Sequence, residues 1–349
     1  MRLRLIFVAL TAVATAAAAA AHYAHATSLL TFAFSTIALA GLAWVVSFAT
    51  EQVGERFGPA VTGVLQSTLG NLPEFFVVIF ALSAGELVVA QTSIVGSIFA
   101  NALLVLGLVI MTGSATANDG VMRFAVRLPK DNAILMTLAS FLIVLVGISS
   151  SSNDKASHHI EAISVAGAVA LLVTYAVWLV DYLRSDVSSR ESEHAAPMLS
   201  MQAALVLLAV AGVGAAFVSD WFISALTPSM ERLGIPKAFA GLVIVAIAGN
   251  AVENTAGLVL ARKEQSDLAI SVVKNSVAQI TAFLYPALVL VSLFFTTRLT
   301  FALDPVLIGA LALTAVALWF ITSDGEATMF EGVALVSLYV ILAVLIWYE

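Results

Sequence analysis

Long apolar segments constrain the fold of this chain more than any other feature of its sequence. Of its 349 residues, 61% are hydrophobic and only 11% are charged. A soluble domain of this length cannot bury so much apolar surface, whereas a helix of roughly 20 apolar residues crosses a bilayer. The sequence therefore predicts an all-α polytopic membrane protein.

Each predicted span approaches or exceeds that length, which gives about 11 transmembrane helices. The first span has a second interpretation, because Arg2 and Arg4 precede an Ala-rich run ending in Ala24-His25-Ala26, as in a secretory signal peptide. We favour a retained N-terminal helix within residues 1–26, and both interpretations leave Thr27 outside. The predicted spans cover residues 3–21, 29–50, 59–83, 87–112, 133–148, 160–182, 199–219, 238–261, 268–296, 306–321 and 329–347.

The basic residues of the loops predict the orientation of these spans. Of the 15 Lys and Arg residues, ten fall in loops on the side of the N-terminus and four in loops on the opposite side, while Lys274 lies inside a predicted helix. By the positive-inside rule, the N-terminus is cytoplasmic and the C-terminus is outside. We expect the protein to lie in the plasma (inner) membrane of a prokaryote.

A short polar motif occurs twice inside apolar segments. It reads Gly70-Asn71-Leu72-Pro73-Glu74 in the first copy and Gly249-Asn250-Ala251-Val252-Glu253 in the second. Adding 179 to Glu74 gives Glu253, and adding 179 to Ser97 gives Ser276. Each copy belongs to a group of five spans, and an odd number of spans inserts the second group upside down. The sequence therefore predicts two inverted repeats, residues 27–183 and 198–349, joined by a cytoplasmic linker at 184–197.

The chemistry of this motif suits a hard cation. A carboxylate within the bilayer costs roughly 2.5–3.5 kcal/mol or more, so an intramembrane Glu indicates function. Gly70, Pro73 and Gly249 weaken the helix and free backbone carbonyls, which can bind cations. Two carboxylates, Glu74 and Glu253, together with amide oxygens form an all-oxygen set of ligands that suits Ca²⁺. We therefore predict a metal site that uses these two acids.

Polar groups at helical spacing accompany each copy. Ser97 and Asn101 are four residues apart, and Ser276 and Gln279 are three apart, so each pair shares a helix face. The alternative is that isolated Ser, Asn or Gly residues serve helix packing, which is the role we expect for Gly96 and Gly107.

Proton coupling follows from the same two acids. A desolvated carboxylate without a cation tends to hold a proton, whereas a divalent ion requires both acids to be ionised. The cation and the protons therefore compete for the same two carboxylates. We expect Ca²⁺ and protons to be transported substrates and no cofactor to be needed. The chain has no Cys and its net charge of −7 argues against nucleic-acid binding. We find no nucleophile–base pair, and predict a transporter rather than an enzyme.

With these residues, the chain resembles the cation/proton exchanger family, the calcium/proton antiporters of the calcium:cation antiporter superfamily. The resemblance starts near Thr50 and includes TEQVGERFGPAVTGVLQSTLGNLPE, SIVGSIFANALLVLG, IPKAFAGLVIVAIAGNAVENTAG and SDGEATMFEGVALVSLYVILAV. It implies a peripheral first helix before two inverted five-helix repeats, with Glu74 and Glu253 as the acids of the exchange site. It also implies ligand or hydrogen-bond roles for Asn71, Asn250, Ser97, Ser276 and Gln279, with Gln66 and Asn101 at further polar positions.

Three departures from the family pattern lie mainly in the second repeat. Asn254 follows the second motif Glu where the family commonly has His, and Lys274 stands where an apolar residue is usual. The acidic helix of many members is reduced to a short linker of mixed charge. We expect Asn254 and Lys274 to be possible modifiers of selectivity. Lys274 has two interpretations: a snorkelling or carboxylate-paired side chain facing away from the site, or an ammonium that occupies or biases the cation site.

The sequence therefore predicts an antiporter that exchanges Ca²⁺ for protons by alternating access around the two glutamates. The alternatives are sodium-coupled exchange, exchange of Mn²⁺ or Na⁺, and a cation-sensing membrane protein that does not transport. The sequence leaves the oligomeric state open.

Overall fold

The computed structural model describes residues 2–54, 56, 69–125, 127–152, 154–186 and 198–349 and is almost entirely helical. Nine of the described helical segments are long and apolar enough to cross a membrane. Two shorter apolar helices, Leu72–Ser83 and Lys237–Gly249, fall in the predicted spans that carry the polar motif. The expected all-α membrane fold is therefore confirmed, whereas the count of eleven spans stays a prediction.

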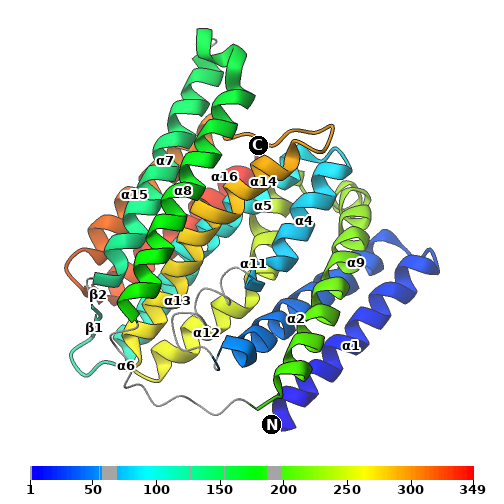
Figure 1. The fold of residues 1–349 in the computed structure, drawn as a ribbon, viewed down its shortest axis with the longest axis horizontal. Helices are drawn as coiled ribbons and strands as arrows, with labels where there is room; N and C mark the ends of the chain where they lie inside the picture. Colours follow the sequence, from blue (N-terminus) through cyan, green and yellow to red (C-terminus); the bar gives the residue numbers. More distant parts are fainter. Residues whose placement is uncertain (1, 55, 57–68, 126, 153, 187–197) are drawn as a thin grey trace.

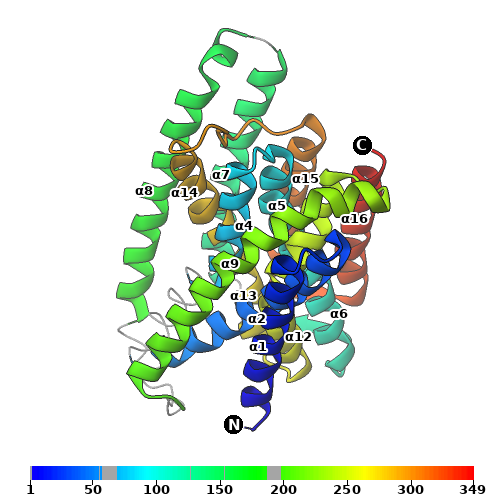
Figure 2. The ribbon, with the colours of Figure 1, turned by 90° about the vertical axis from the view of Figure 1, so that its right-hand side faces the viewer.

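Three long helices form one side of the molecule: α1 (Arg2–Tyr23), α2 (Ser28–Gly54) and α9 (Met201–Leu233). They lie together at the right of Figure 1 and in front in Figure 2. Thr11 of α1 packs where Gly41 leaves room on α2. Only 17% of the apolar stretch of α1 is buried, so the first helix is peripheral, as expected.

The remaining helices form the larger part of the molecule. In the first half these are α4 (Leu72–Ser83), α5 (Leu87–Phe99), the π-helix η1 (Ala100–Val105), α6 (Leu106–Thr116), α7 (Arg127–Ser152), the 3₁₀-helix η2 (Lys155–His159) and α8 (Ile160–Asp186). In the second half they are α10 (Lys237–Phe239), the π-helix η3 (Ala240–Val245), α11 (Ala246–Gly249), α12 (Ala251–Arg262), α13 (Ser266–Gln279), the π-helix η4 (Ile280–Leu284), α14 (Tyr285–Ser292), α15 (Pro305–Thr322) and α16 (Met329–Trp347).

Backbone angles at equivalent positions of the two halves agree. Asn71 has φ −85° and ψ 9°, and Asn250 has φ −100° and ψ 18°. Glu86 and Gln265, also 179 residues apart, have φ/ψ of −86°/63° and −89°/61°. The residues before them, Gly85 and Glu264, both have positive φ. These matches support the predicted repeat, while its boundaries at 27–183, 184–197 and 198–349 stay predictions.

Glycines set the closest helix crossings. A Cβ added to Gly96 of α5 would overlap the backbone of Leu242 in η3, and one added to Gly107 of α6 would lie 2.7 Å from the carbonyl oxygen of Gly332 in α16. These contacts confirm that Gly96 and Gly107 permit close packing. Small residues let membrane helices approach closely because association there depends on van der Waals contact.

Several predicted ends of spans are wrong. The span predicted at 199–219 extends as α9 to Leu233, because Asp220 lies on an exposed face and does not end the helix. The span predicted at 133–148 lies within the longer α7, which has 26 residues. The span predicted at 268–296 ends at Ser292, and α8 continues to Asp186, into the predicted linker. Residues 187–197 of that linker lie outside the described residues.

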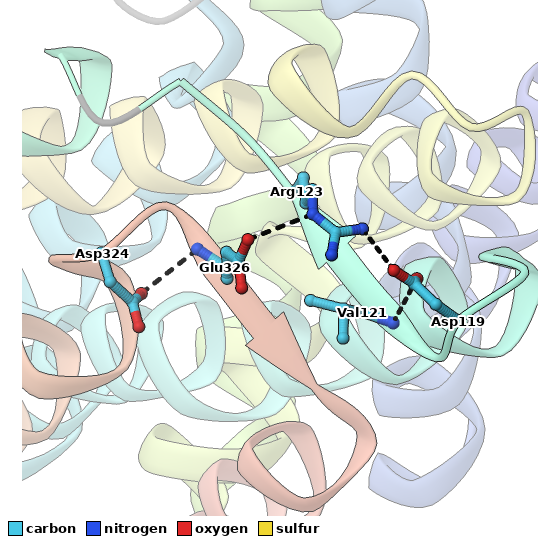
Figure 3. A network of polar contacts seen from close by, with 5 residues as sticks. All are labelled: Asp119, Val121, Arg123, Asp324 and Glu326. Atoms are coloured by element: carbon cyan, nitrogen blue, oxygen red, sulfur yellow. Dashed lines mark hydrogen bonds and ion pairs between the residues drawn. The ribbon is translucent and has the colours of Figure 1, made fainter.

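Two short strands join loops of the two halves. β1 (Val121–Arg123) pairs antiparallel with β2 (Glu326–Thr328), with Met122 opposite Ala327. Figure 3 shows Arg123 between Asp119 and Glu326, with N–O distances of 2.6 and 3.1 Å. All three side chains are more than half exposed, so these ion pairs stabilise the fold only slightly. By the predicted orientation, this sheet is on the cytoplasmic face. In both views the N-terminus lies at the bottom of the molecule and the C-terminus in its upper half, below the tips of α7 and α8.

Candidate cation site

The first copy of the motif interrupts a helix. The chain is helical at Leu69 and Gly70, leaves the helix at Asn71 and begins α4 at Leu72. Pro73 lies in the first turn of α4, where its missing N–H costs nothing. Glu74 is in the same turn and only 2% exposed, so its carboxylate is buried at the positive end of the helix dipole.

The second copy repeats this break. α11 ends at Gly249, Asn250 is not helical, and α12 begins at Ala251, which places Glu253 in the first turn of α12. The side chains of residues 251–254 lie outside the described ones, as does all of Gln66. The predicted roles of Gln66, Glu253 and Asn254 therefore stay predictions, although the backbone around Glu253 matches that around Glu74.

The two breaks meet at the centre of the fold. A Cβ added to Gly249 would lie 3.9 Å from the Cβ of Glu74. A cavity of about 10 Å³, roughly the size needed for one water, lies beside Glu74 and Gly249. Its other walls come from α2, α9 and η3, through Leu39, Phe222 and Val245 among others.

Hydrogen bonds join the two repeats at this junction. Asn250 Nδ2 donates to Ser97 Oγ at 2.8 Å and to the carbonyl oxygen of Ala246 at 2.9 Å. Asn101 Nδ2 donates to Asn250 Oδ1 at 2.8 Å. The three side chains are at most 1% exposed, and their bonds hold the second break against α5 and η1. The structure thus brings together Ser97, Asn101 and Asn250, of which only Ser97 and Asn101 were placed on one face by their spacing.

Several buried oxygens of the predicted site residues have no hydrogen-bond partner among the described residues. They are Asn101 Oδ1, Ser276 Oγ and Gln279 Oε1. Ser276 and Gln279 are 5% and 3% exposed, at the end of α13 next to the π-helix η4. A buried oxygen without a partner is costly, and a bound cation or ordered water would satisfy it. Asn71 is 6% exposed at the end of α4, so all described site residues are buried.

Lys274 lies apart from this junction. Its Nζ donates to Thr322 Oγ1 of α15 at 2.6 Å, and the cavity that it lines contains none of the predicted site residues. The interpretation that Lys274 faces away is therefore supported, but its partner is a hydroxyl and not a carboxylate.

Sequence reasoning missed a contact at the opposite end from the sheet. Lys237 Nζ donates to both carboxylate oxygens of Glu86 at 2.9 Å, and Thr227 Oγ1 donates to the same carboxylate at 2.8 Å. Burial would raise the pKa of Glu86, but these hydrogen bonds outweigh it, so the pKa lies below its ordinary value of 4.5. Glu86 and Lys237 both fall between predicted spans, and no signal in the sequence indicates that they meet.

Comparison with known proteins bears on both the fold and the site. A family model described as "Sodium/calcium exchanger protein" matches residues 27–181 and 203–348. The "Vacuolar calcium ion transporter" of Schizosaccharomyces pombe is 30% identical and covers 91% of this chain and 79% of its own length. The "Ca(2+)/H(+) antiporter ChaA" of Bacillus subtilis is 28% identical, and the match covers 97% of this chain and 98% of that protein.

Two solved structures share the whole fold. The structure titled "Structure of native YfkE" has a TM-score of 0.84 at 26% identity and covers 98% of this chain and 100% of its own. An "H+/Ca2+ Exchanger CAX" has a TM-score of 0.76 at 16% identity, covers 100% of this chain and 92% of its own, and shows the fold alone. The apolar helices of this chain thus adopt the arrangement of known membrane transporters.

Proposed function

This chain belongs to the sodium/calcium exchanger protein family, and on that premise we propose that it exchanges Ca²⁺ for protons across the membrane. Two of its relatives are named Ca²⁺/H⁺ antiporters, from Bacillus subtilis and Aphanothece halophytica. The observation that carries the proposal is the junction at which Gly249 and Glu74 line one cavity and Asn250 bonds to Ser97 and Asn101. It supports one shared site made from both repeats.

At this site, Glu74 and Glu253 alternately bind the cation and protons. Ca²⁺ prefers carboxylate and carbonyl oxygens, and the unpartnered oxygens of Asn101, Ser276 and Gln279 supply further ligands. When Ca²⁺ leaves, protons replace its positive charge on the two acids. This exchange prevents two negative charges from remaining uncompensated in a medium of low polarity.

Alternating access is the movement that such a junction permits. The site lies where the two repeats meet, and rocking of one group of helices against another exposes it to each side in turn. The layer of α1, α2 and α9 contacts the cavity beside Glu74 through Leu39 and Phe222. We infer that displacement of this layer relative to the remaining helices opens the site.

The test is transport by the purified protein in vesicles with an imposed pH gradient. We expect proton-driven Ca²⁺ uptake that is abolished in Glu74→Gln and in Glu253→Gln, because each variant removes one of the two exchangeable charges. Glu161→Gln is the matched control, since Glu161 is 57% exposed and forms only a long ion pair with Arg298, at 3.9 Å.

Three outcomes would contradict the proposal. Flux that requires Na⁺ indicates sodium-coupled exchange, and flux of Mn²⁺ or Na⁺ in place of Ca²⁺ indicates another selectivity. Binding of Ca²⁺ without any flux indicates a sensor.

A further inference from the structure

The cavity around Lys274 has no role in the proposed exchange. It has a volume of about 40 Å³ and lies between α7, α13 and α15, with η1 and α6 at its back. Lys274 is 7% exposed and Thr322 is 3% exposed. The walls are otherwise mainly apolar, with Leu106, Val273 and Val277 among them.

The amine of Lys274 is incompletely paired among the described residues. Its hydrogen bond goes to Thr322 Oγ1, whose own proton is donated to the carbonyl oxygen of Leu318 at 2.6 Å. None of the four ion pairs formed by described residues includes Lys274. An ammonium has three N–H donors, so two remain for a ligand in the cavity. A buried charge without a partner is expensive, which favours an anion as the ligand.

The cavity opens toward the bilayer. Thr137 and Trp319 line it and are exposed, Trp319 by 54%, and both belong to helices with spanning apolar stretches, 134–152 and 305–322. Thr322 is the last residue of α15, so the amine lies near the end of a span, where lipid head groups begin. An anion entering by this route must be amphiphilic.

The volume limits the size of the anionic group. A water-sized group needs about 10–15 Å³ of such space, so 40 Å³ holds about three of them. The carbon and two oxygens of a carboxylate match this number, whereas a phosphodiester with its ester groups is larger. We propose that Lys274 binds the carboxylate of a single-chain amphiphile, such as a long-chain fatty acid, whose chain leaves the cavity past Trp319.

Trp319 provides a readout at the site. Bromine quenches tryptophan fluorescence at short range, so we would titrate the reconstituted protein with a fatty acid brominated along its chain. The difference in quenching between the wild type and Trp319→Phe is the signal from Trp319, which lines the cavity. We expect saturable quenching in the wild type, and an apparent Kd raised about tenfold or more in Lys274→Met, because a hydrogen bond to a charged group is lost. Lys274→Arg keeps the charge and should retain most of the binding.

Two further probes keep the test decisive even if Lys274→Met does not fold. A fatty alcohol with the same brominated chain should quench Trp319 at least about tenfold more weakly in the wild type, because it lacks the charge. Equal quenching by acid and alcohol, or unchanged affinity in a folded Lys274→Met, would show ordinary contact with lipid chains and overturn the proposal. Tighter quenching by a brominated phosphatidylglycerol would also overturn it, since the cavity would then select a phosphate. Each readout is a binding measurement, so its outcome is independent of Ca²⁺ transport.

Discussion

A single side chain, Asn250, connects the second motif to two polar side chains of the first repeat. It ends one helix, begins the next, and bonds to Ser97 and Asn101 of the other repeat. Its amide provides both a hydrogen-bond donor and an acceptor, and the side chain is fully buried from solvent. Removal of Asn250 therefore takes the donor from Ser97 Oγ and leaves Asn101 Nδ2 with only the carbonyl oxygen of Ser97 as acceptor.

We expect Asn250→Ala to lower the free energy of unfolding by about 1–3 kcal/mol, because Ser97 Oγ loses its donor and Asn101 Nδ2 loses an acceptor. Chemical denaturation in detergent measures the change. Ser337→Ala is the control, since Ser337 is exposed and bonds only to its own helix at Val333. Equal stability of the two variants would show that the junction contributes little.

At this scale the sequence predicted that Ser97 and Asn101 share a helix face, because they are four residues apart, and Asn101 Nδ2 donates to the carbonyl oxygen of Ser97. Their hydrogen bonds to Asn250 were not predicted, because spacing within one helix does not identify a partner on another. The partner of Lys274 was not predictable, because Thr322 is 48 residues away and meets it only through the packing of α13 on α7 and α15.

At the scale of elements, interrupted helices position the site. Each motif breaks its span at an Asn and restarts a helix whose first turn carries the Glu. The π-helices η1 and η4 follow Ser97 and Gln279 at nearly equivalent places in the two repeats. Such wide turns often occur at functional sites, because they shift the side chains of the next turn relative to a regular helix.

The crossing of α5 and η3 depends on Gly96. We expect Gly96→Ala to destabilise the protein by about 1–3 kcal/mol, because the added Cβ meets the backbone of Leu242, which cannot move aside as a side chain can. Gly309→Ala is the matched control, because an added Cβ there meets nothing within 4 Å. Since Ala favours a helix over Gly by about 1 kcal/mol, this control should become slightly more stable. Thermal unfolding in detergent compares both, and a neutral Gly96→Ala would contradict the packing argument.

The elements show why hydropathy predicts helices better than their ends. The broken spans were predictable, because Gly and Pro within an apolar stretch indicate where the backbone hydrogen bonds of the helix are interrupted. The end of α9 was not, since the helix continues beyond Asp220, whose side chain is exposed, to a left-handed Gly234 cap with φ of 67°. Composition alone does not distinguish a charge that ends a span from one that lies on its exposed face.

At the scale of the whole molecule, contacts on opposite faces hold the two repeats together. One face has the sheet with Arg123, and the other has Glu86 bonded to Lys237 and Thr227. The second contact joins the corner between α4 and α5 to α9 and α10. In the proposed alternating access, opening on this face would break it. By the predicted orientation this is the outer face.

We expect Glu86→Gln to increase exposure of the site to the outer face. The chain has no cysteine, so a single Ala248→Cys reporter in the cavity beside Glu74 can be labelled by a membrane-impermeant thiol reagent. Labelling should become several-fold faster with Glu86→Gln, because the ion pair with Lys237 is lost, and remain unchanged with Glu161→Gln.

The same contact predicts a pH dependence. The pKa of Glu86 is below 4.5, so the contact is fully present above pH 4.5 and is lost as the pH falls through the lower folded-state value. The thiolate fraction of any Cys falls with pH, so the labelling rate of the reporter is divided by that of a solvent-exposed reference Cys. This ratio should be flat between neutral pH and pH 5 and rise only in stronger acid. A rise already near pH 6 would exclude Glu86 as its cause.

The contact between Gly249 and Glu74 has a consequence for how the chain can be divided. Each half, expressed as its own polypeptide, would contain one motif and one interrupted helix, but neither would contain a complete set of oxygens. Asn250 would lack Ser97 and Asn101, and Glu74 would lack the surface of Gly249. Function in such a divided protein would belong only to the reassembled pair, so the two halves behave as obligate subunits that share one chain.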